Sequence, residues 1–318
     1  MKITDLINNS KGVAFSFELL PPLKGSGVDK FYMQIDRLLE FDPKYINITT
    51  HHSEFVQRTL DCGKLTKQNI RKRPGTVAIA ATIQQKYNIP AVPHIICSGF
   101  SKAETEYVLV DLQILGINNL LLLQGDKGKL EPNLFSEDET NRYALDLQGQ
   151  VNRYNEGFFD DGTEMISKPA IPFSYGVAGY PEKHAEASTM DSDIYFLKEK
   201  VKAGAEYIVT QMFFDNQKYF DFVKRCRAEG ITVPIIPGVK PIVFTNQLTV
   251  LPKIFGTEIP EILAKELAKC KSDNDAKQVG VEWGIKQCRE LIKAGVPSIH
   301  FYTLMATDSV ALIAKEVY

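Results

Sequence analysis

In Ala203-Gly204-Ala205-Glu206-Tyr207-Ile208-Val209-Thr210, a helix ends and a buried strand begins. The amphipathic stretch before it stops at Gly204, because glycine readily takes the left-handed conformation that ends a helix. The run 207–210 is nearly continuous in apolar and β-branched residues, which is typical of a strand covered on both faces. The segment therefore predicts one helix-to-strand unit of a parallel sheet.

The same unit recurs along the chain and sets the fold class. Gly116, Gly230 and Gly295 also end helical stretches shortly before strand-like runs. The strand candidates are 13–19, 45–50, 92–97, 119–123, 173–178, 207–210, 233–236 and 298–302. Eight strands that alternate with helices in 318 residues favour a (β/α)8 TIM barrel over a doubly wound sheet. We expect a single α/β domain, a TIM barrel that spans 1–318.

The segment 127–172 breaks this rhythm. It is long and polar, and it carries the acidic stretches Glu137-Asp138-Glu139 and Asp160-Asp161-Gly162. We interpret it as an insertion after the fourth strand, with a helix around 141–154 and a turn at Asp161-Gly162. The stretch after Asp273, in contrast, keeps a helical period, and its apolar stripe predicts that Trp283 packs in the core.

Charge and composition exclude several classes of protein. The 37 Lys and Arg against 39 Asp and Glu give a net charge of −2, which provides no positive field for nucleic acid or an anionic membrane. The first residues lack the apolar core of a signal peptide, and no apolar run approaches about 18 residues, so we expect a cytoplasmic protein with no membrane partner. The five cysteines are scattered without a Cys-x-x-Cys pair, which predicts free thiols rather than disulfides or a zinc ribbon.

The sequence also lacks familiar cofactor motifs. His51 and His52 are adjacent and diverge in direction, and no further spacing completes a site, so we expect no metal. Gly25-Ser26-Gly27 lacks the third glycine of a dinucleotide fingerprint, and no phosphate-binding loop is present. Any dinucleotide must therefore bind by a route other than a Rossmann motif.

In a TIM barrel the reactive side chains follow the carboxyl ends of the strands, which directs attention to Glu18. Glu18 lies inside Phe17-Glu18-Leu19-Leu20-Pro21-Pro22, between apolar residues and before two prolines. Such surroundings raise the pKa of a carboxyl group toward that of a general acid. A salt-bridged or capping glutamate is the alternative, and the residues alone leave both open.

Two further strand ends carry polar side chains. Gly125 in Leu123-Gln124-Gly125-Asp126 permits close approach of a flat ligand, and Asp126 places a negative charge in the mouth of the barrel. A turn held by an Asx-type bond from Asp126 is the alternative. Gln211 ends an apolar strand, where its amide requires partners. Ligand recognition and a core hydrogen bond both fit Gln211.

Seven motifs at and around these positions occur in the order of one known family. They are Phe-Glu-Leu-Leu-Pro-Pro at 17–22, Pro-His-Ile-Ile-Cys at 93–97, Gly-Asp at 125–126, Gly-Tyr-Pro-Glu-Lys-His with Glu-Ala at 179–187, Thr-Gln-Met-Phe-Phe-Asp at 210–215, Ile-Pro-Gly at 236–238 and His-Phe-Tyr-Thr-Leu at 300–304. Each motif is weak alone, but seven in register are very specific. Together they resemble the methylenetetrahydrofolate reductases, flavin-dependent barrel enzymes of one-carbon metabolism.

The resemblance implies a bound FAD that takes hydride from NADH or NADPH and passes it to 5,10-methylenetetrahydrofolate by a ping-pong route. The product, 5-methyltetrahydrofolate, would feed methionine synthesis. Opening the imidazolidine ring of the substrate requires a proton on the departing N10 and yields a 5-iminium cation. The resemblance makes Glu18 the acid that supplies this proton, and Asp126 the group that stabilises positive charge on the pterin and tunes the flavin.

Further roles are carried over from the family by position. The folate would be bound by Asp126, Gln211, Gln247 and Tyr302, and the nicotinamide would meet Thr49 and Gln211. FAD would be contacted by Thr50, His52, His94, Gln124, Gly125, Asp126, Tyr143, Ala144, Tyr180, His184, Ala187, Asp193 and Lys200. Lys200 has a simple rationale, because the FAD pyrophosphate requires cationic or amide partners. An ordinary exposed lysine is the alternative for this residue.

Three features depart from the family pattern. Gln124 replaces an arginine beside the flavin, which would change flavin affinity or redox potential. Ala306 stands where an arginine near the folate tail is expected, and Lys240 is a candidate to substitute for it. Because the chain stops at Tyr318, just after the barrel, we expect neither the regulatory domain of eukaryotic relatives nor inhibition by S-adenosylmethionine.

Two other functions stay open at this point. The missing arginines fit a flavin- or folate-binding barrel with a different acceptor or without turnover, although Glu18 and Asp126 speak against it. A flavin-free aldolase is disfavoured, because no lysine is placed at a strand end for a Schiff base and no phosphate loop is recognisable. The family resemblance also predicts a homo-oligomer.

Overall fold

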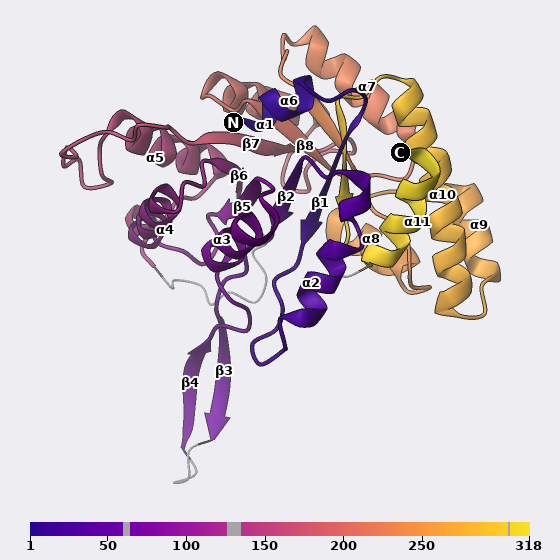
Figure 1. The fold of residues 1–318 in the computed structure, drawn as a ribbon, viewed down its shortest axis with the longest axis horizontal. Helices are drawn as coiled ribbons and strands as arrows, with labels where there is room; N and C mark the ends of the chain where they lie inside the picture. Colours follow the sequence, from indigo (N-terminus) through magenta and orange to yellow (C-terminus); the bar gives the residue numbers. More distant parts are fainter. Residues whose placement is uncertain (60–63, 126–134, 305) are drawn as a thin grey trace.

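Eight parallel strands close into a barrel in this computed structural model, which describes residues 1–59, 64–125, 135–304 and 306–318 (Figure 1). The strands are β1 (Ala14–Leu19), β2 (Tyr45–Ile48), β5 (Ala91–Ile96), β6 (Asn119–Leu123), β7 (Ser174–Gly179), β8 (Tyr207–Met212), β9 (Ile235–Val239) and β10 (Ser298–Tyr302). Their order around the barrel is β1-β10-β9-β8-β7-β6-β5-β2, and β2 pairs with β1 to close it. The predicted TIM barrel is therefore confirmed, with small differences at the strand ends.

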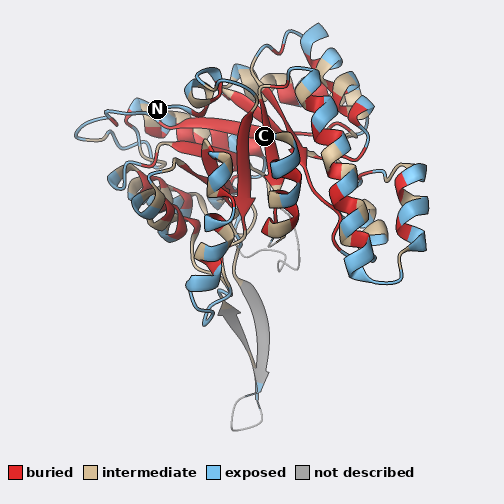
Figure 2. Cartoon of the chain, turned by 45° about the vertical axis from the view of Figure 1, so that its right-hand side comes forward, coloured by how far each residue is buried: buried red, intermediate tan, exposed pale blue. Residues whose placement is uncertain are grey.

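Helices between successive strands form the outer layer. They are α2 (Asp29–Asp36), α3 (Thr76–Tyr87), α4 (Lys102–Ile114), α5 (Ala144–Glu156), α6 (Met190–Lys202), α7 (Asn216–Ala228) and α10 (Asp273–Lys293), with α11 (Thr307–Val317) after the last strand. Local sequence explains their ends: Ser101 Oγ accepts a hydrogen bond from Glu104 N at the start of α4, and Gly157, with a φ of 97°, ends α5. Figure 2 shows the strands buried and the helices exposed on their outer sides. None of the described helices has both the length and the apolar character that crossing a membrane requires.

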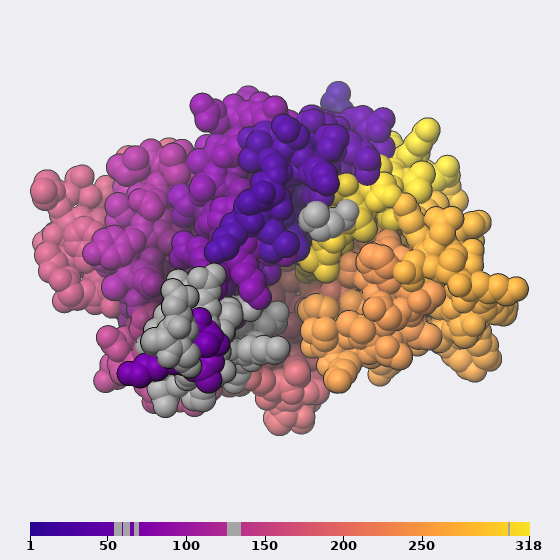
Figure 3. Space-filling view, turned by 90° about the horizontal axis from the view of Figure 1, so that it is seen from below, coloured from indigo at the N-terminus to yellow at the C-terminus, as the bar shows by residue number. Residues whose placement is uncertain are grey.

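Two additions to the repeat were missed by the sequence analysis. An antiparallel hairpin of β3 (Glu54–Thr59) and β4 (Leu65–Ile70) follows β2 and projects from the barrel (Figure 1). Two helices, α8 (Gln247–Phe255) and α9 (Glu261–Lys269), follow β9. In Figure 3, which looks onto the molecule from below, the orange segment that contains them lies beside the yellow C-terminal helices. Both additions lie near the carboxyl ends of the barrel strands.

The predicted insertion 127–172 includes a regular part of the barrel. Its predicted helix is α5, which occupies the place of the barrel helix between β6 and β7. The predicted turn is also present, since Thr163 N donates to Asp161 Oδ1 at 2.8 Å and Phe158 bridges to Glu164. The short 3-10 helix Glu137–Glu139 precedes α5. α5 is therefore part of the regular barrel. Among the described residues of 127–172, the segments before and after α5 are the ones added to the repeat.

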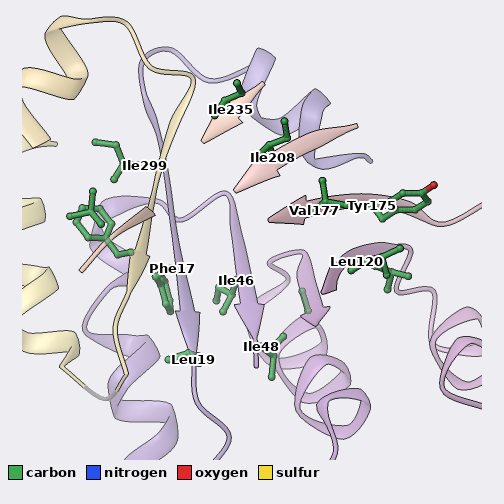
Figure 4. Packing of buried hydrophobic residues seen from close by; sticks show 14 of the residues in the cluster. Phe17, Leu19, Ile46, Ile48, Leu120, Tyr175, Val177, Ile208, Ile235 and Ile299 are labelled. Carbon is green, nitrogen blue, oxygen red and sulfur yellow. The ribbon is translucent and has the colours of Figure 1, made fainter. Parts of the chain in front are cut away.

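The main apolar core fills the space between the strands and the helices. It contains outward-facing strand residues such as Ile46, Ile208 and Ile299, and Figure 4 shows members of this cluster on successive strands. Three of the described cysteines, Cys97, Cys226 and Cys288, are buried in it as free thiols, as predicted. Cys62 lies outside the described residues. Trp283 packs against a separate cluster near α8 and donates its indole N–H to Phe214 O at 3.0 Å, which confirms that it is a packing residue.

The barrel interior is divided into an apolar lower part and a polar upper part. The short helix α1 (Ile3–Asn8) inserts Ile3 and Ile7 at the amino ends of the strands, where they pack with Tyr45 and Tyr207. Gly176 leaves room for the Tyr207 ring, because a Cβ at this glycine would lie 2.3 Å from Cε2. Above this plug several interior side chains are polar and buried: Ser16, Glu18, Asn47, His94 and His300. Polar residues inside a closed barrel indicate a site at its upper end.

Candidate active site

A cavity of about 620 Å³ opens at the carboxyl ends of the barrel strands. Its size and position are those expected for a ligand site in a TIM barrel. The predicted site residues that line it are Glu18, Thr49, Thr50, His52, His94, Gln124, Gly125, Tyr180, His184, Gln211 and Tyr302. They come from all the barrel strands except β9 and from the loops that follow them. The structure thus brings together residues that are up to 284 positions apart in the sequence, from Glu18 to Tyr302.

Glu18 lies in the cavity wall and is almost fully buried, with 5% of its surface exposed. Burial raises its pKa to about 8, and the nearby Lys240 charge opposes this rise. The rise that the sequence predicted is therefore confirmed. A carboxyl group with this pKa holds its proton at neutral pH, as a general acid must.

A neutral histidine lies next to this carboxyl group. His94 Nε2 is 4.0 Å from Glu18 Oε2 and 3.2 Å from Asn47 Oδ1. Burial, assisted by His51, lowers the pKa of His94 to about 3, so the ring carries no charge at neutral pH. Below it, His300 Nδ1 lies 3.0 Å from Ser16 Oγ, and burial also lowers its pKa to about 3. His94 therefore provides Glu18 with a polar neighbour that carries no positive charge, and His300 below it is neutral as well.

Gly125 holds the end of β6 in a conformation that requires glycine. Its φ is +80°, and an added Cβ would lie 3.0 Å from Ile96 Cβ. Ser98 fixes the same turn, because its Oγ donates to Gln124 O at 3.0 Å and to Gly125 O at 3.3 Å. The side chain of Gln124 then donates to Glu186 Oε2 at 3.2 Å. Asp126, which follows, lies outside the described residues, as does Met305, so the roles predicted for Asp126 stay predictions.

Replacing Gly125 by alanine is expected to lower the free energy of unfolding by about 2 kcal/mol, because the left-handed φ and the contact with Ile96 both oppose a Cβ. Gly162→Ala is a matched control, since Gly162 has a φ of +85° but nothing within 4 Å of the added atom. The free energy of unfolding of Gly162→Ala should fall by only about 1 kcal/mol. Urea unfolding measures both variants, and equal losses would show that the contact with Ile96 is not tight.

A second cavity of about 370 Å³ adjoins the first and shares Gln124, Tyr180 and His184 with it. The other predicted cofactor residues that line it are Tyr143, Ala144, Ala187, Asp193 and Lys200. His184 N donates to Asp193 Oδ2 at 2.8 Å, which ties the loop after β7 to helix α6. Burial lowers the pKa of Lys200, and Asp193 opposes this. Lys200 is therefore a partly buried cation facing a cavity, rather than an ordinary surface lysine.

Of the residues predicted to bind folate, Gln211, Tyr302 and Gln247 are described, and they differ in whether they line a cavity. Gln211 lines the first cavity, and its Oε1 accepts a hydrogen bond from Met212 N at 2.9 Å. Tyr302 also lines it, and its hydroxyl donates to Thr210 O at 2.7 Å. Gln247 lines neither cavity; its Oε1 accepts from Val243 N at 2.7 Å and from Phe244 N at 3.2 Å. The structure thus gives Gln247 a role in shaping the loop before α8, and its contact with folate stays a prediction.

Lys240 is buried and lines neither of the two cavities. Only 2% of its surface is exposed, and burial lowers its pKa to about 8 while Glu18 raises it. The prediction that Lys240 could replace the missing arginine at the rim is therefore corrected. The reason is that Lys240 directly follows β9 and is buried at the upper end of the barrel. The expectation that no lysine lies at a strand end is therefore also wrong, although Lys240 lines neither cavity.

The model of the family described as methylenetetrahydrofolate reductase matches residues 2–318. The chain belongs to the methylenetetrahydrofolate reductase family. The resemblance inferred from the seven motifs is thereby confirmed.

Individual members and one solved structure agree with this assignment. The chain is 32% identical over 305 residues to a probable methylenetetrahydrofolate reductase (NADPH) of Caenorhabditis elegans, with 95% of this chain and 42% of that protein covered. It is 30% identical over 292 residues to the 5,10-methylenetetrahydrofolate reductase of Salmonella typhimurium, with 91% and 85% covered. The chain therefore spans less than half of the nematode relative but most of the bacterial one.

A protein of Clostridium thermocellum, titled as binding two copies of 5-methyl-5,6,7,8-tetrahydrofolic acid, has a similar fold. The TM-score is 0.58 at 16% sequence identity, and 99% of this chain and 98% of that chain are covered. At this identity the likeness supports the TIM barrel alone.

Several cavity residues of this reductase-family chain were not singled out from the sequence as binding residues. His51, Phe255 and Leu304 line the first cavity, and Phe196 lines the second. His51 and Leu304 follow strands directly, so the rule that directed attention to Glu18 applied to them as well. Phe255 belongs to α8, an element that was not predicted. In the described part of the chain, no group of three His, Cys, Asp or Glu side chains is arranged to hold a metal ion.

Proposed function

We propose that this chain reduces 5,10-methylenetetrahydrofolate to 5-methyltetrahydrofolate, with FAD as cofactor and NADH or NADPH as electron donor. The observation that carries the proposal is Glu18, a buried carboxyl group with a pKa of about 8 in the cavity of a member of this family. Reduction of this substrate breaks a C–N bond, and the departing nitrogen must receive a proton. A carboxyl group that is protonated at neutral pH supplies it.

The residues present fit FAD. Two adjoining cavities that share a wall suit a ligand with two linked ends. The second cavity offers Lys200, a partly buried cation that would be stabilised by the pyrophosphate. FAD, when bound, supplies the exchange of hydride between the nicotinamide and the folate. In this arrangement Gly125 lets the backbone approach the flat ring, and Gln124, steadied by Glu186, takes the place of a charged partner.

The chain's own residues account for the acid–base part of the folate step. Glu18 donates a proton to N10 of the folate, and neutral His94 with Asn47 forms a polar wall that carries no competing charge. Gln211 on β8 would bind the folate, and its position in the lining of the same cavity supports this role. Because the protonated form of Glu18 is the active one, folate reduction should fall as the pH rises through its pKa of about 8.

The proposal is tested by flavin absorbance under anaerobic conditions. Purified protein is mixed with FAD, then with NADH or NADPH, and finally with methylenetetrahydrofolate. Bleaching by the nicotinamide followed by recolouring with the folate is the expected result. Bleaching without recolouring would instead support a flavoprotein with another acceptor, and failure to take up FAD would refute the proposal.

Replacing Lys200 by methionine is expected to raise the dissociation constant for FAD about tenfold, because one charge-assisted contact with the pyrophosphate is lost. Lys198→Met is the matched control on the same helix, since Lys198 pairs with Glu229 at 3.2 Å and does not line either cavity. Quenching of flavin fluorescence on titration measures both constants. Equal affinities in the two variants would remove Lys200 from the FAD site.

A further inference from the structure

Lys240 is a buried cation at the upper end of the barrel. It directly follows Val239, the last residue of β9, and Val239 faces outward into the main apolar core. Because successive residues of a strand point to opposite sides, Lys240 continues the inward-facing series of Ile236 and Gly238. With 2% of its surface exposed, its ammonium group is held inside the protein.

Strand register places Lys240 in the same layer as Glu18. Glu18 of β1 pairs with Tyr302 of β10, and Phe301 pairs with Val239 of β9. Continuing that register by one residue sets Tyr302 beside Lys240. Glu18, Tyr302 and Lys240 therefore lie at one height on β1, on β10 and directly after β9, and Glu18 and Tyr302 also line the cavity.

We propose that Lys240 is a positioning residue for Glu18, whose buried ammonium group stabilises the carboxylate that remains after Glu18 has donated its proton. Its role in turnover rests on the proposed reaction, but its action on the Glu18 carboxyl group does not. In the forward step the proton passes from Glu18 to N10 of the folate, and the C–N bond to N10 breaks. A carboxylate then faces the Lys240 ammonium group until a proton from water restores the acid.

The titratable groups next to Glu18 on the neighbouring strands, His94 and Tyr302, contribute no positive charge. His94 on β5 is neutral because burial, assisted by His51 in the same cavity wall, lowers its pKa to about 3, and His300, two residues before Tyr302 on β10, is neutral because burial lowers its pKa to about 3. Tyr302 also keeps its proton, since burial and Glu18 raise its pKa well above the usual value. Asn47 and Gln211 are uncharged amides. Of the described groups around Glu18, Lys240 is thus the one whose charge lowers the pKa of the carboxyl group.

The two buried groups influence each other in opposite directions. Burial alone would raise the pKa of Glu18 further and would lower that of Lys240 further, and each opposite charge limits the shift of the other. Without the ammonium group, the carboxylate would be buried with no compensating charge. Glu18 would then hold its proton more strongly and donate it less readily.

The coupling is tested by infrared titration of the full chain as purified. The carbonyl band of protonated Glu18 is identified as the band that Glu18→Gln abolishes, and its intensity is followed against pH. In Lys240→Met and Lys240→Gln the midpoint should rise by about one pH unit or more, because an opposite charge has been removed. Lys240→Arg, which keeps the charge, should restore the midpoint to within about 0.3 units. Lys253→Met, an exposed lysine change on α8, should leave it unmoved.

Rate measurements separate this inference from the proposed reaction. In Lys240→Met the rate of the folate half-reaction should fall about fivefold, and the pH at which this rate declines should be higher than in the wild-type chain. The rate of flavin reduction by the nicotinamide should stay within about twofold of the wild-type rate. An unchanged infrared midpoint in both neutral variants, or an equal shift in Lys253→Met, overturns the inference. If the midpoint moves but no folate reduction occurs in the wild-type chain, the coupling stands and the proposed reaction fails.

Discussion

Replacing Glu18 by glutamine is expected to slow the folate half-reaction by about 10²- to 10⁴-fold, which is the usual contribution of a positioned general acid. Glutamine has the same size as glutamate and donates a hydrogen bond, but it has no acidic proton to give to N10. Reduction of the flavin by NADH or NADPH should continue at nearly the wild-type rate, because hydride transfer from the nicotinamide requires no proton from Glu18. Anaerobic stopped-flow absorbance at the flavin band resolves the two half-reactions in one protein sample.

A matched change and a stability measurement complete this experiment. Glu40→Gln removes an exposed carboxyl group in the short 3-10 helix Leu39–Phe41 before β2 and should leave both half-reactions unchanged. Glu18→Gln should not unfold the protein, since it removes an ionisable group from a buried site where ionisation is costly. Equal slowing of both half-reactions would assign Glu18 to flavin binding or to structure, and a wild-type folate rate would exclude it as the acid.

The barrel could be predicted because its signals are local. Four of the units show an amphipathic stretch, a glycine such as Gly204, and an apolar run such as 207–210 close together in the sequence. Gly204 has a φ of +115°, as such a helix end requires. Repetition of the unit then determines the fold class, because a chain with this alternation has few ways to bury every strand.

The elements that were missed do not follow the helix-to-strand repeat. Helix α1 has six residues, too few to be stable alone, and it is held by the burial of Ile3 and Ile7 against Tyr45 and Tyr207. The pair α8 and α9 follows β9, where the alternation predicts a single helix. The hairpin of β3 and β4 is a local antiparallel pair outside the barrel, so the search for buried parallel strands did not detect it.

The candidate site was predictable to the extent that it follows the strand ends. Glu18, Gln124 and Gln211 were found by this rule, and the family resemblance added the residues of the second cavity. Lys240 shows the limit of the method. A lysine after a strand is expected at the surface, and its burial becomes visible only when the neighbouring elements are in place. Helix α10 packs closely on the segment that follows β9, since Gly280 meets the backbone of Ile242, two residues after Lys240.

Replacing Gly280 by alanine is expected to lower the free energy of unfolding by about 3 kcal/mol, because an added Cβ would lie 1.9 Å from Ile242 O and 2.9 Å from Ile242 N. Both partners are backbone, of α10 and of the segment after β9, so neither can rotate away and the helix itself must shift. Urea unfolding measures the loss as a lower midpoint at an unchanged slope.

Two other helical glycines provide the comparison that makes this prediction specific. Gly284→Ala, one turn further along α10, would meet Ile313 Cδ1 at 2.5 Å, the movable end of a side chain, and should cost about 1 kcal/mol. Gly149→Ala in α5 has nothing within 4 Å and should stabilise the protein by about 0.5–1 kcal/mol. Because Ile242 lies two residues after Lys240, the shift of α10 in Gly280→Ala should also move the midpoint of the Glu18 titration, whereas Gly284→Ala should leave it in place. If Gly280→Ala costs no more than Gly284→Ala, α10 does not pack on the backbone of Ile242 as closely as the structure shows.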